Sequence, residues 1–468
     1  MHESCAVTGV YAHDEDVARL TFFALFALQH RGQESSGIAT ADGKKIQLYA
    51  EMGLVSQVFD EDALSNLTGY IAIGHNRYST SGSSQVCNAQ PILVGKGGDT
   101  IAIAHNGNIV NAKHLYEELS EMGYAFGTST DTEVIANLII SSHEKDMVDK
   151  IRYAMRRLQG VYSLTIMTKD RLFAVRDPLG LRPLCLGSIN GGWVLASESC
   201  ALDHIGASFI REIEPGEILA IGENGIESYQ EDSGKRALCA FEYIYFARLD
   251  STINGKLLYL ARQAMGARLA EEHPVEADLV VGVPESAIAA ATGYAQRSGI
   301  PLAEGLVKNR YVGRTFIEPD QRIRDLGVKL KYNPMPQVLE GKRIVMVDDS
   351  IVRGTTTPHV IKLLRRAGAK EVHMRIVAPP IRYPCFFGVD MATYQQLLAA
   401  RKTVSEIKEC IGADSLGYLS VEGLIKAIDL PGDNFCLACF TGDYPIPVQI
   451  EMDKLALETL AADRQGNS

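Results

Sequence analysis

Residues 343–357 read Arg-Ile-Val-Met-Val-Asp-Asp-Ser-Ile-Val-Arg-Gly-Thr-Thr-Thr. The apolar run Ile344–Val347 is typical of a strand, and two adjacent acids, Asp348 and Asp349, end it. A turn at Gly354–Thr356 follows, and a helical pattern begins after the turn. This stretch therefore predicts a strand, a loop and a helix in succession.

A loop of this kind is suited to a phosphorylated sugar. Backbone N–H groups and hydroxyls at a helix N-terminus bind phosphate well. Asp348 and Asp349 repel a phosphate, so they suit ribose hydroxyls or a magnesium ion that the substrate holds. The alternative is an ordinary parallel strand that ends in acidic loop residues. The acid pair and Gly-Thr-Thr occur together at a suitable spacing, and this favours the ligand site.

Length and composition limit the class of protein. The 468-residue chain is long enough for two or three domains, and its 46% hydrophobic content is typical of a globular protein. A formal net charge of −11 argues against nucleic-acid binding and against an acidic membrane surface. The sequence has no bilayer-spanning apolar run and no signal-peptide pattern at its start. We therefore expect a cytoplasmic protein whose nine cysteines are core residues, metal ligands or catalytic thiols.

The first half of the chain is rich in short strand patterns. Examples are Ile71–Gly74, Ile101–His105 and Tyr162–Met167, and helical patterns interrupt them at Val17–Leu28 and Asp131–Ser142. We expect this mixture to form a first domain of α+β type that ends near residue 230.

The second half alternates apolar strands with helices. The expected strands are Ala277–Val283, Arg343–Val347 and Val372–Val377. Such alternation predicts an α/β domain with a parallel sheet covered by helices, over residues 231–468. The polar stretch Gly225–Lys235 is the best candidate for the linker between the two domains.

Cys5 lies close to the start of the chain, before an apolar strand-like segment. If residues 1–4 are removed as a propeptide, Cys5 supplies both a thiol nucleophile and an α-amine with a pKa of roughly 7.7–8.0 that can act as a base. A buried apolar cysteine on a first strand is the alternative.

Four further segments resemble the glutaminase domain of class II (N-terminal nucleophile) amidotransferases. They are Gln29–Glu34, His75–Thr80, Ala104–Asn108 and Ser129–Glu133. The resemblance implies that Arg77 binds the glutamine carboxylate and that Asp131 binds its ammonium group. It also implies that Asn106 and Gly107 stabilise the tetrahedral oxyanion. Taken singly, these residues could form a surface salt bridge and a hairpin turn instead.

The run at 343–357 resembles the binding motif of phosphoribosyltransferases, whose donor is phosphoribosyl pyrophosphate. Both halves together resemble the glutamine phosphoribosylpyrophosphate amidotransferase family, which catalyses the first step of purine synthesis. The resemblance implies a four-layer αββα first domain with the nucleophile at its N-terminus and a phosphoribosyltransferase second domain. It also implies a homotetramer and purine nucleotides as feedback inhibitors. The donor-binding residues are then Asp348, Asp349, Ser350, Arg353, Gly354, Thr355, Thr356, Lys308, Arg310 and Tyr311.

Two further loops match this family. Gly282–Ser286 resembles its pyrophosphate loop, which implies that Ser286 lies near the magnesium ion beside Asp348 and Asp349. The basic, aromatic segment Lys308–Ile317 resembles a flexible loop that closes over the substrate and excludes water. A solvated basic loop is the alternative for this segment.

Cys436 and Cys439 form a C-x-x-C pair, which is a metal or redox signature. Thiolate ligands suit zinc or an iron–sulfur cluster, and the spacing alone does not choose between them. The resemblance adds Cys239 and Cys385, since these four positions match the [4Fe–4S] ligands of the cluster-containing branch. Four buried thiols, as in the cluster-free branch, are the alternative.

Two other functional classes can be weighed. One is a different class II amidotransferase, such as an aminosugar or asparagine synthase, and the acid pair at 348–349 argues against it. The other is a non-catalytic regulator that kept the fold, and the intact residues at both sites argue against that.

Overall fold

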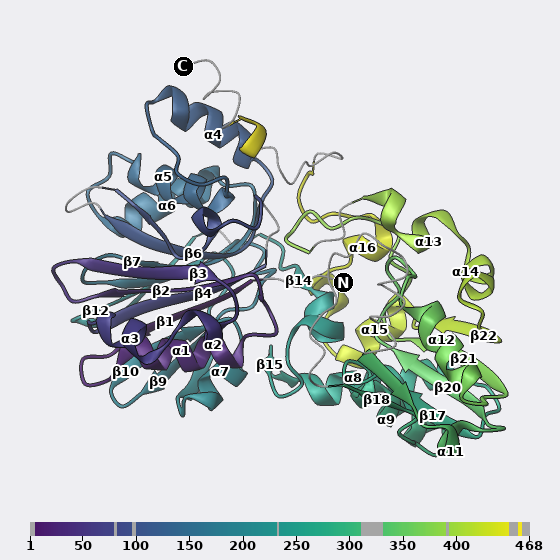
Figure 1. Cartoon of the computed structure of the whole chain (residues 1–468). Coiled ribbons are helices and arrows are strands. Elements are labelled where there is room, and N and C mark those ends of the chain that lie inside the picture. The colour runs from purple at the N-terminus through teal and green to yellow at the C-terminus, as the bar shows by residue number, and fades with distance from the viewer. Residues whose placement is uncertain are drawn as a thin grey trace.

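The computed structural model describes residues 5–78, 82–95, 100–231, 234–309, 331–389, 393–448 and 457–460. Two domains lie side by side, the first in purple and blue and the second in green and yellow (Figure 1). The first domain is built around two stacked antiparallel sheets, and the second around one parallel sheet. Both expected domain types are therefore confirmed.

In its described part, the first domain contains a seven-stranded sheet in the order β11-β9-β10-β1-β4-β2-β3. Its strands are β1 (Ala6–Tyr11), β2 (Ser35–Ala41), β3 (Ile46–Met52), β4 (Ile71–Arg77), β9 (Cys185–Ile189), β10 (Gly192–Ala196) and β11 (Ser208–Glu212). The central pair is β1 and β4, in which Ala6 lies opposite Asn76. This register brings the start of β1 next to the end of β4.

The second sheet of this domain has the described order β13-β12-β8-β7-β6-β5. Its strands are β5 (Ile92–Val94), β6 (Ile101–Ile109), β7 (Gly160–Met167), β8 (Leu172–Arg176), β12 (Glu217–Gly222) and β13 (Gly225–Gln230). Alternate residues of both sheets, including Val7, Ile73, Ala104 and Leu172, form one buried apolar layer between them.

Helices cover the outer faces of the two sheets (Figure 1). Those on the first sheet are α1 (Val17–Ala27), α2 (Val55–Val58), α3 (Glu61–Asn66) and α7 (Ser199–His204). Those on the second are α4 (Ala112–Glu121), α5 (Asp131–Ile140) and α6 (Met147–Arg157). The order of layers is helix, sheet, sheet, helix, which confirms the expected αββα architecture.

The second domain has a parallel sheet with the described order β17-β20-β21-β22. The strands are β17 (Leu279–Gly282), β20 (Arg343–Asp348), β21 (Glu371–Ile376) and β22 (Ser415–Tyr418). They share one buried core with α8 (Leu258–Glu272), α9 (Ile288–Ser298), α12 (Thr357–Arg366), α14 (Val404–Ile411) and α15 (Val421–Ile428). Because β17 and β20 are neighbours in parallel, the loops after them meet at one edge of the sheet.

The linker expected at Gly225–Lys235 is wrong over its first six residues. Gly225–Gln230 forms β13 and pairs along its whole length with β12. Its polar composition is that of an edge strand on which Glu227, Ser228 and Gln230 are exposed, while Ile226 and Tyr229 pack against the two apolar cores. The second sheet of the first domain accordingly extends to Gln230, and the linker is shorter than its composition indicates.

The chain returns to the first domain near its C-terminal end. Leu457, in the short helical segment 457–460, is buried in the core under α4 and α5. The neighbouring Glu458 carboxylate accepts hydrogen bonds from Ser83 N at 2.5 Å and from Ser129 Oγ at 3.0 Å. None of the described helices combines the length and the apolar character that crossing a bilayer requires.

Candidate functional site

Cys5 is buried immediately before β1, beside the end of β4. Its Sγ lies 3.3 Å from the carbonyl oxygen of Tyr78, to which it donates, and Tyr78 N donates to Sγ at 3.4 Å. Burial raises the pKa of the thiol to about 11, although Tyr78 and Arg77 act to lower that pKa. The thiol is therefore protonated near neutral pH and needs a base before it can attack a substrate.

Opposite charges flank this thiol. Arg77, 2% exposed, ends β4, and its Nη1 donates to Ser83 O at 3.1 Å. Asp131 begins α5, where its Oδ2 accepts a hydrogen bond from Ile109 N at 3.1 Å. Arg77 lowers the pKa of Cys5 and Asp131 raises it, so both act on the same sulfur. The structure thus brings together the two residues expected to hold the charged groups of glutamine.

Asn106 and Gly107 lie inside β6. Asn106 is completely buried, and neither its Nδ2 nor its Oδ1 has a hydrogen-bond partner among the described residues. A side chain at Gly107 would place its Cβ 2.0 Å from Val161 O, so only glycine fits there. A buried amide without a partner is costly unless a ligand satisfies it, which suits an oxyanion donor.

Asp348 and Asp349 stand at the carboxyl end of β20. Asp349 N donates to the Asp348 carboxylate at 2.9 Å, and Ser350 Oγ donates to the Asp349 carboxylate. Burial, together with the negative charge of Asp349, raises the pKa of Asp348 well above its usual value. Two carboxyl groups that repel each other in this way favour hydroxyl donors or a cation.

The loop after the acid pair leads into α12, as the sequence predicted. Arg353, Thr355 and Thr356 are exposed, and the side chain of Thr356 does not cap the helix. Gly354 has φ +69°, and a Cβ there would lie 2.4 Å from the side chain of Leu398. This glycine therefore allows a tight turn into α12. Because Pro358 has no N–H and the N–H groups of His359 and Val360 donate to Thr356 O, a phosphate here would be held by the loop before the helix.

Two other residues expected at the phosphoribosyl pyrophosphate and magnesium site lie at the same edge of the sheet. Ser286 follows β17 and is half-buried. Lys308 ends β18 (Leu306–Lys308), and its Nζ lies 3.6 Å from the Glu285 carboxylate. Arg310 and Tyr311 lie outside the described residues.

The four expected ligand cysteines are brought together. Cys239 in β14 (Leu238–Cys239) pairs directly with Cys436 in β23 (Phe435–Cys436). Backbone N–H groups of Arg382 and Tyr383 donate to Cys439 O and hold the segment that contains Cys385 beside it. The four thiols line one cavity, whose remaining walls are Leu181, Phe241, Phe387, Val389, Ala438 and Tyr444.

These thiols lie in an apolar setting. Burial raises the pKa of Cys239 to about 12 and also raises the pKa values of Cys436 and Cys439. In the part of the chain that the structure describes, no three His, Cys, Asp or Glu side chains are arranged to hold a single metal ion. The four thiols thus share the lining of one cavity.

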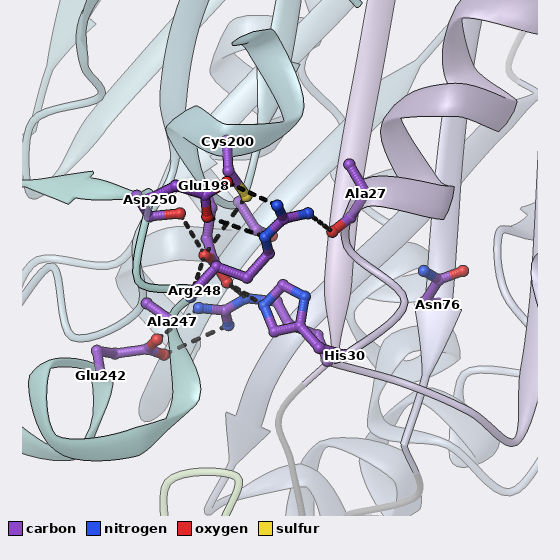
Figure 2. A network of polar contacts seen from close by, with 12 residues as sticks. Ala27, His30, Asn76, Glu198, Cys200, Glu242, Ala247, Arg248 and Asp250 are labelled. Carbon is purple, nitrogen blue, oxygen red and sulfur yellow. Dashed lines mark hydrogen bonds and ion pairs between the residues drawn. The ribbon is translucent and has the colours of Figure 1, made fainter. Parts of the chain in front are cut away.

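The sequence did not indicate the ion network that joins the domains. Arg31, from the Gln29–Glu34 segment, is 1% exposed and contacts two buried carboxylates, Glu198 and Glu242. Glu242 belongs to the second domain and also pairs with Arg182, at 3.2 Å. Figure 2 shows Glu198 and Glu242 in this network, with His30 and Arg248 beside Glu198. The only hint in the sequence is that Arg31 stands within Gln29–Glu34, a segment that was singled out for another reason.

Comparisons with known proteins identify the two kinds of domain. Residues 75–204 match the glutamine amidotransferase domain family, and residues 255–383 match the phosphoribosyl transferase domain family. The chain is 51% identical to the amidophosphoribosyltransferase of Synechococcus elongatus, over 98% of this chain and 95% of the relative. It is 50% identical to that of Methanocaldococcus jannaschii, over 96% and 98% of the two chains.

A solved structure is equally similar. The glutamine phosphoribosylpyrophosphate amidotransferase of B. subtilis, complexed with ADP and GMP, superposes with a TM-score of 0.91 at 46% identity, covering 97% of this chain and 100% of that one. The chain therefore belongs to the amidophosphoribosyltransferase family, whose members join a glutamine amidotransferase domain to a phosphoribosyltransferase domain and catalyse the first step of purine biosynthesis.

Proposed function

We propose that Cys5, once it is freed by removal of residues 1–4, is the nucleophile that cleaves glutamine. Its new α-amine takes the thiol proton, and the sulfur then attacks the side-chain carbonyl carbon of glutamine. The C–N bond breaks, ammonia leaves with that proton, and water hydrolyses the glutamyl thioester to glutamate. The raised pKa of the Cys5 thiol supports a mechanism with a built-in base.

Arg77 and Asp131 orient the substrate in this scheme. The guanidinium of Arg77 binds the α-carboxylate, and the Asp131 carboxylate binds the α-ammonium group. Asn106 Nδ2 and Gly107 N–H then donate to the oxyanion. The completely buried, unpaired amide of Asn106 is the observation that carries this assignment, because glutamine would supply the partner that the protein does not.

Intact mass spectrometry of the purified protein tests the nucleophile. We expect a mature chain that begins at Cys5 and that, after rapid acid quenching in the presence of glutamine, carries a glutamyl group on the N-terminal peptide. A fully active enzyme that retains residues 1–4 would contradict the proposal.

At the second site, the ammonia attacks C1 of phosphoribosyl pyrophosphate, and pyrophosphate leaves. The products of the whole reaction are 5-phosphoribosylamine, glutamate and pyrophosphate. Asp348 and Asp349 hold the ribose hydroxyls, while the backbone of Ser350–Thr356 and the side chains of Arg353, Thr355 and Thr356 hold the 5-phosphate. Lys308, Arg310 and Tyr311 are assigned to donor binding as well, and Lys308 at the end of β18 places its ammonium group beside Glu285 at the same edge of the sheet.

The same edge of the sheet fits a magnesium ion. Ser286, Asp348 and Asp349 offer the oxygen ligands that magnesium prefers, and the mutual repulsion of the acid pair favours a bound cation. When bound, the ion neutralises charge on the leaving pyrophosphate.

The four cysteines fit a [4Fe–4S] cluster with a structural role. Cys239, Cys385, Cys436 and Cys439 line one largely apolar cavity, and four thiolates are the ligand set that such a cluster takes. When bound, a cluster cross-links distant parts of the chain and so stabilises the fold. Anaerobically purified protein should be brown and contain about four iron atoms per chain. Colourless, fully active protein with zinc or without metal would refute the cluster.

The B. subtilis relative was solved with ADP and GMP. We infer that purine nucleotides also inhibit this enzyme and that it acts in the cytoplasm as a homo-oligomer. Inhibition curves with single and paired nucleotides, together with sedimentation velocity, test the inhibitors and the assembly.

A further inference from the structure

A short turn that begins at a cluster cysteine touches the glutamine-hydrolysing domain at three successive residues. Phe386 O accepts a hydrogen bond from Asn108 Nδ2 at 2.9 Å, and Phe387 O accepts one from Arg182 Nη2 at 2.7 Å. Gly388, with φ +91°, lies so close to Gly107 that an added Cβ would stand 3.0 Å from the Gly107 carbonyl oxygen. The turn Cys385–Gly388 is thus fitted against the end of β6.

The contacted part of β6 is the part that carries the proposed oxyanion donors. Asn106, Gly107 and Asn108 are consecutive and pair with Val161–Ser163 of β7. On the β7 side, Val161 O leaves no room for a side chain at Gly107. On the other side stands the turn, so this length of strand is held between β7 and a segment of the second domain.

The contact between the turn Cys385–Gly388 and the first domain is buried and largely apolar. Asn108 is 8% exposed and Arg182 is completely buried. Val161 and Leu181 from the first domain pack in one apolar cluster with Phe386 and Phe387 from the second, and Cys385 lies against this cluster. Water therefore cannot easily replace the Asn108–Phe386 hydrogen bond, so its loss would be felt as a shift of the strand.

We propose that Asn108 is a positioning residue for glutamine hydrolysis, through which the cysteine-anchored turn Cys385–Gly388 fixes the oxyanion donors of β6. This inference rests on the roles proposed for Asn106, Gly107 and Cys385. A misplacement of about 1 Å at a catalytic group can cost about a hundredfold in rate. Disturbing the turn should therefore slow amide cleavage, while transfer of free ammonia at the separate second site continues.

A matched pair of glycines tests the turn. Gly388 and Gly442 each lie three residues after a cluster cysteine and each have positive φ, +91° and +86°. An added Cβ at Gly388 would meet Gly107 of the first domain, whereas one at Gly442 would meet the ring of Tyr383. Gly388→Ala and Gly442→Ala therefore share the backbone strain, and only the first presses on β6.

The variants Asn108→Asp, Gly388→Ala, Gly442→Ala and Asn106→Ala should be purified anaerobically as the full, metal-containing enzyme. Iron per chain, the rates with glutamine and with ammonia, and hydrogen exchange of residues 104–109 are then measured. Asn108→Asp and Gly388→Ala should lower the glutamine-to-ammonia rate ratio by about tenfold to a hundredfold through kcat, with normal iron content. Exchange at 104–109 should rise in both, and Gly442→Ala should keep the wild-type ratio.

Equal rate ratios for Gly388→Ala and Gly442→Ala, together with a wild-type ratio for Asn108→Asp, would overturn the inference. If Gly388→Ala does not fold, Asn108→Asp still decides, because aspartate has the size of asparagine but offers no N–H to Phe386 O. Asn106→Ala tests the proposed oxyanion site separately from the positioning role of the turn. A normal kcat in that variant removes the proposed oxyanion site itself, whereas a reduced kcat leaves that site standing whatever the turn variants show.

Discussion

The two reaction sites of this chain are built in different ways. Cys5, Arg77, Asn106 and Asp131 are all buried, immediately before a strand, within paired strands or at the first turn of a helix. The sugar site instead follows the end of one parallel strand, and Arg353, Thr355 and Thr356 are exposed there. Amide cleavage needs donors fixed in advance and little water, whereas a phosphate binds to open N–H groups that its own charge organises.

The first domain therefore has to hold its site more rigidly than the second. Its site is fixed from within by two sheets and from outside by the second domain, which contributes Glu242 to the ion network and Phe386 to the end of β6.

Removing the negative charge of Glu242 from the ion network between the domains should have the largest effect. Glu242→Ala leaves Arg31 and Arg182 buried without one of their carboxylate partners, which should cost about 3–5 kcal/mol of unfolding free energy. Denaturant unfolding measures it, and both activities should decline together. Glu422→Ala is the control, because Glu422 forms an exposed pair with Lys426 and should matter little. Equal stability of the two variants would show that the domains are joined by other means.

Asn106→Ala should separate the two sites by rate. Loss of an oxyanion donor lowers kcat by about 10²–10³-fold, so glutamine-dependent synthesis should fall by that factor with little change in the KM for glutamine. Steady-state kinetics with both nitrogen sources measures it, and the ammonia-dependent rate serves as the internal control. An increase in KM alone would assign Asn106 to substrate binding instead.

The acid pair should show the smaller effect expected of a half-exposed site. Replacing both residues, Asp348→Asn with Asp349→Asn, removes charged hydrogen-bond acceptors and should raise the concentration of phosphoribosyl pyrophosphate required by about tenfold to a hundredfold. The increase should be the same with glutamine and with ammonia. A donor KM equal to that of the wild type would remove the acid pair from the sugar site.

Much of this architecture follows from local sequence signals. The helix expected at Val17–Leu28 is α1 (Val17–Ala27), and the strand, acid pair, glycine turn and helix of 343–357 occur in the expected order. These elements depend on neighbours in sequence. The cysteine grouping instead came from a family resemblance, because Cys239 and Cys436 meet only through a pairing of distant strands.

The sequence did not predict contacts between residues far apart in the chain, nor a strand of mostly polar composition. Arg31 and Glu242 pair across 211 positions, and no periodicity links such residues. Asn108 belongs to a motif chosen for its neighbours, yet its partner Phe386 lies 278 positions away. The stretch Gly225–Gln230 reads as a linker because an edge strand carries polar residues where it meets solvent, and only its pairing with β12 identifies it as a strand.

We propose that one buried thiol, that of Cys5, releases ammonia for a separate sugar site. The sharpest test compares synthesis from glutamine with synthesis from added ammonia in the Cys5→Ala variant. We expect this variant to lose glutamine-dependent synthesis and to make no glutamate. It should still form phosphoribosylamine from added ammonia at a rate close to that of the wild type. Retained glutamine-dependent turnover in Cys5→Ala, with the substitution verified by mass, would contradict it.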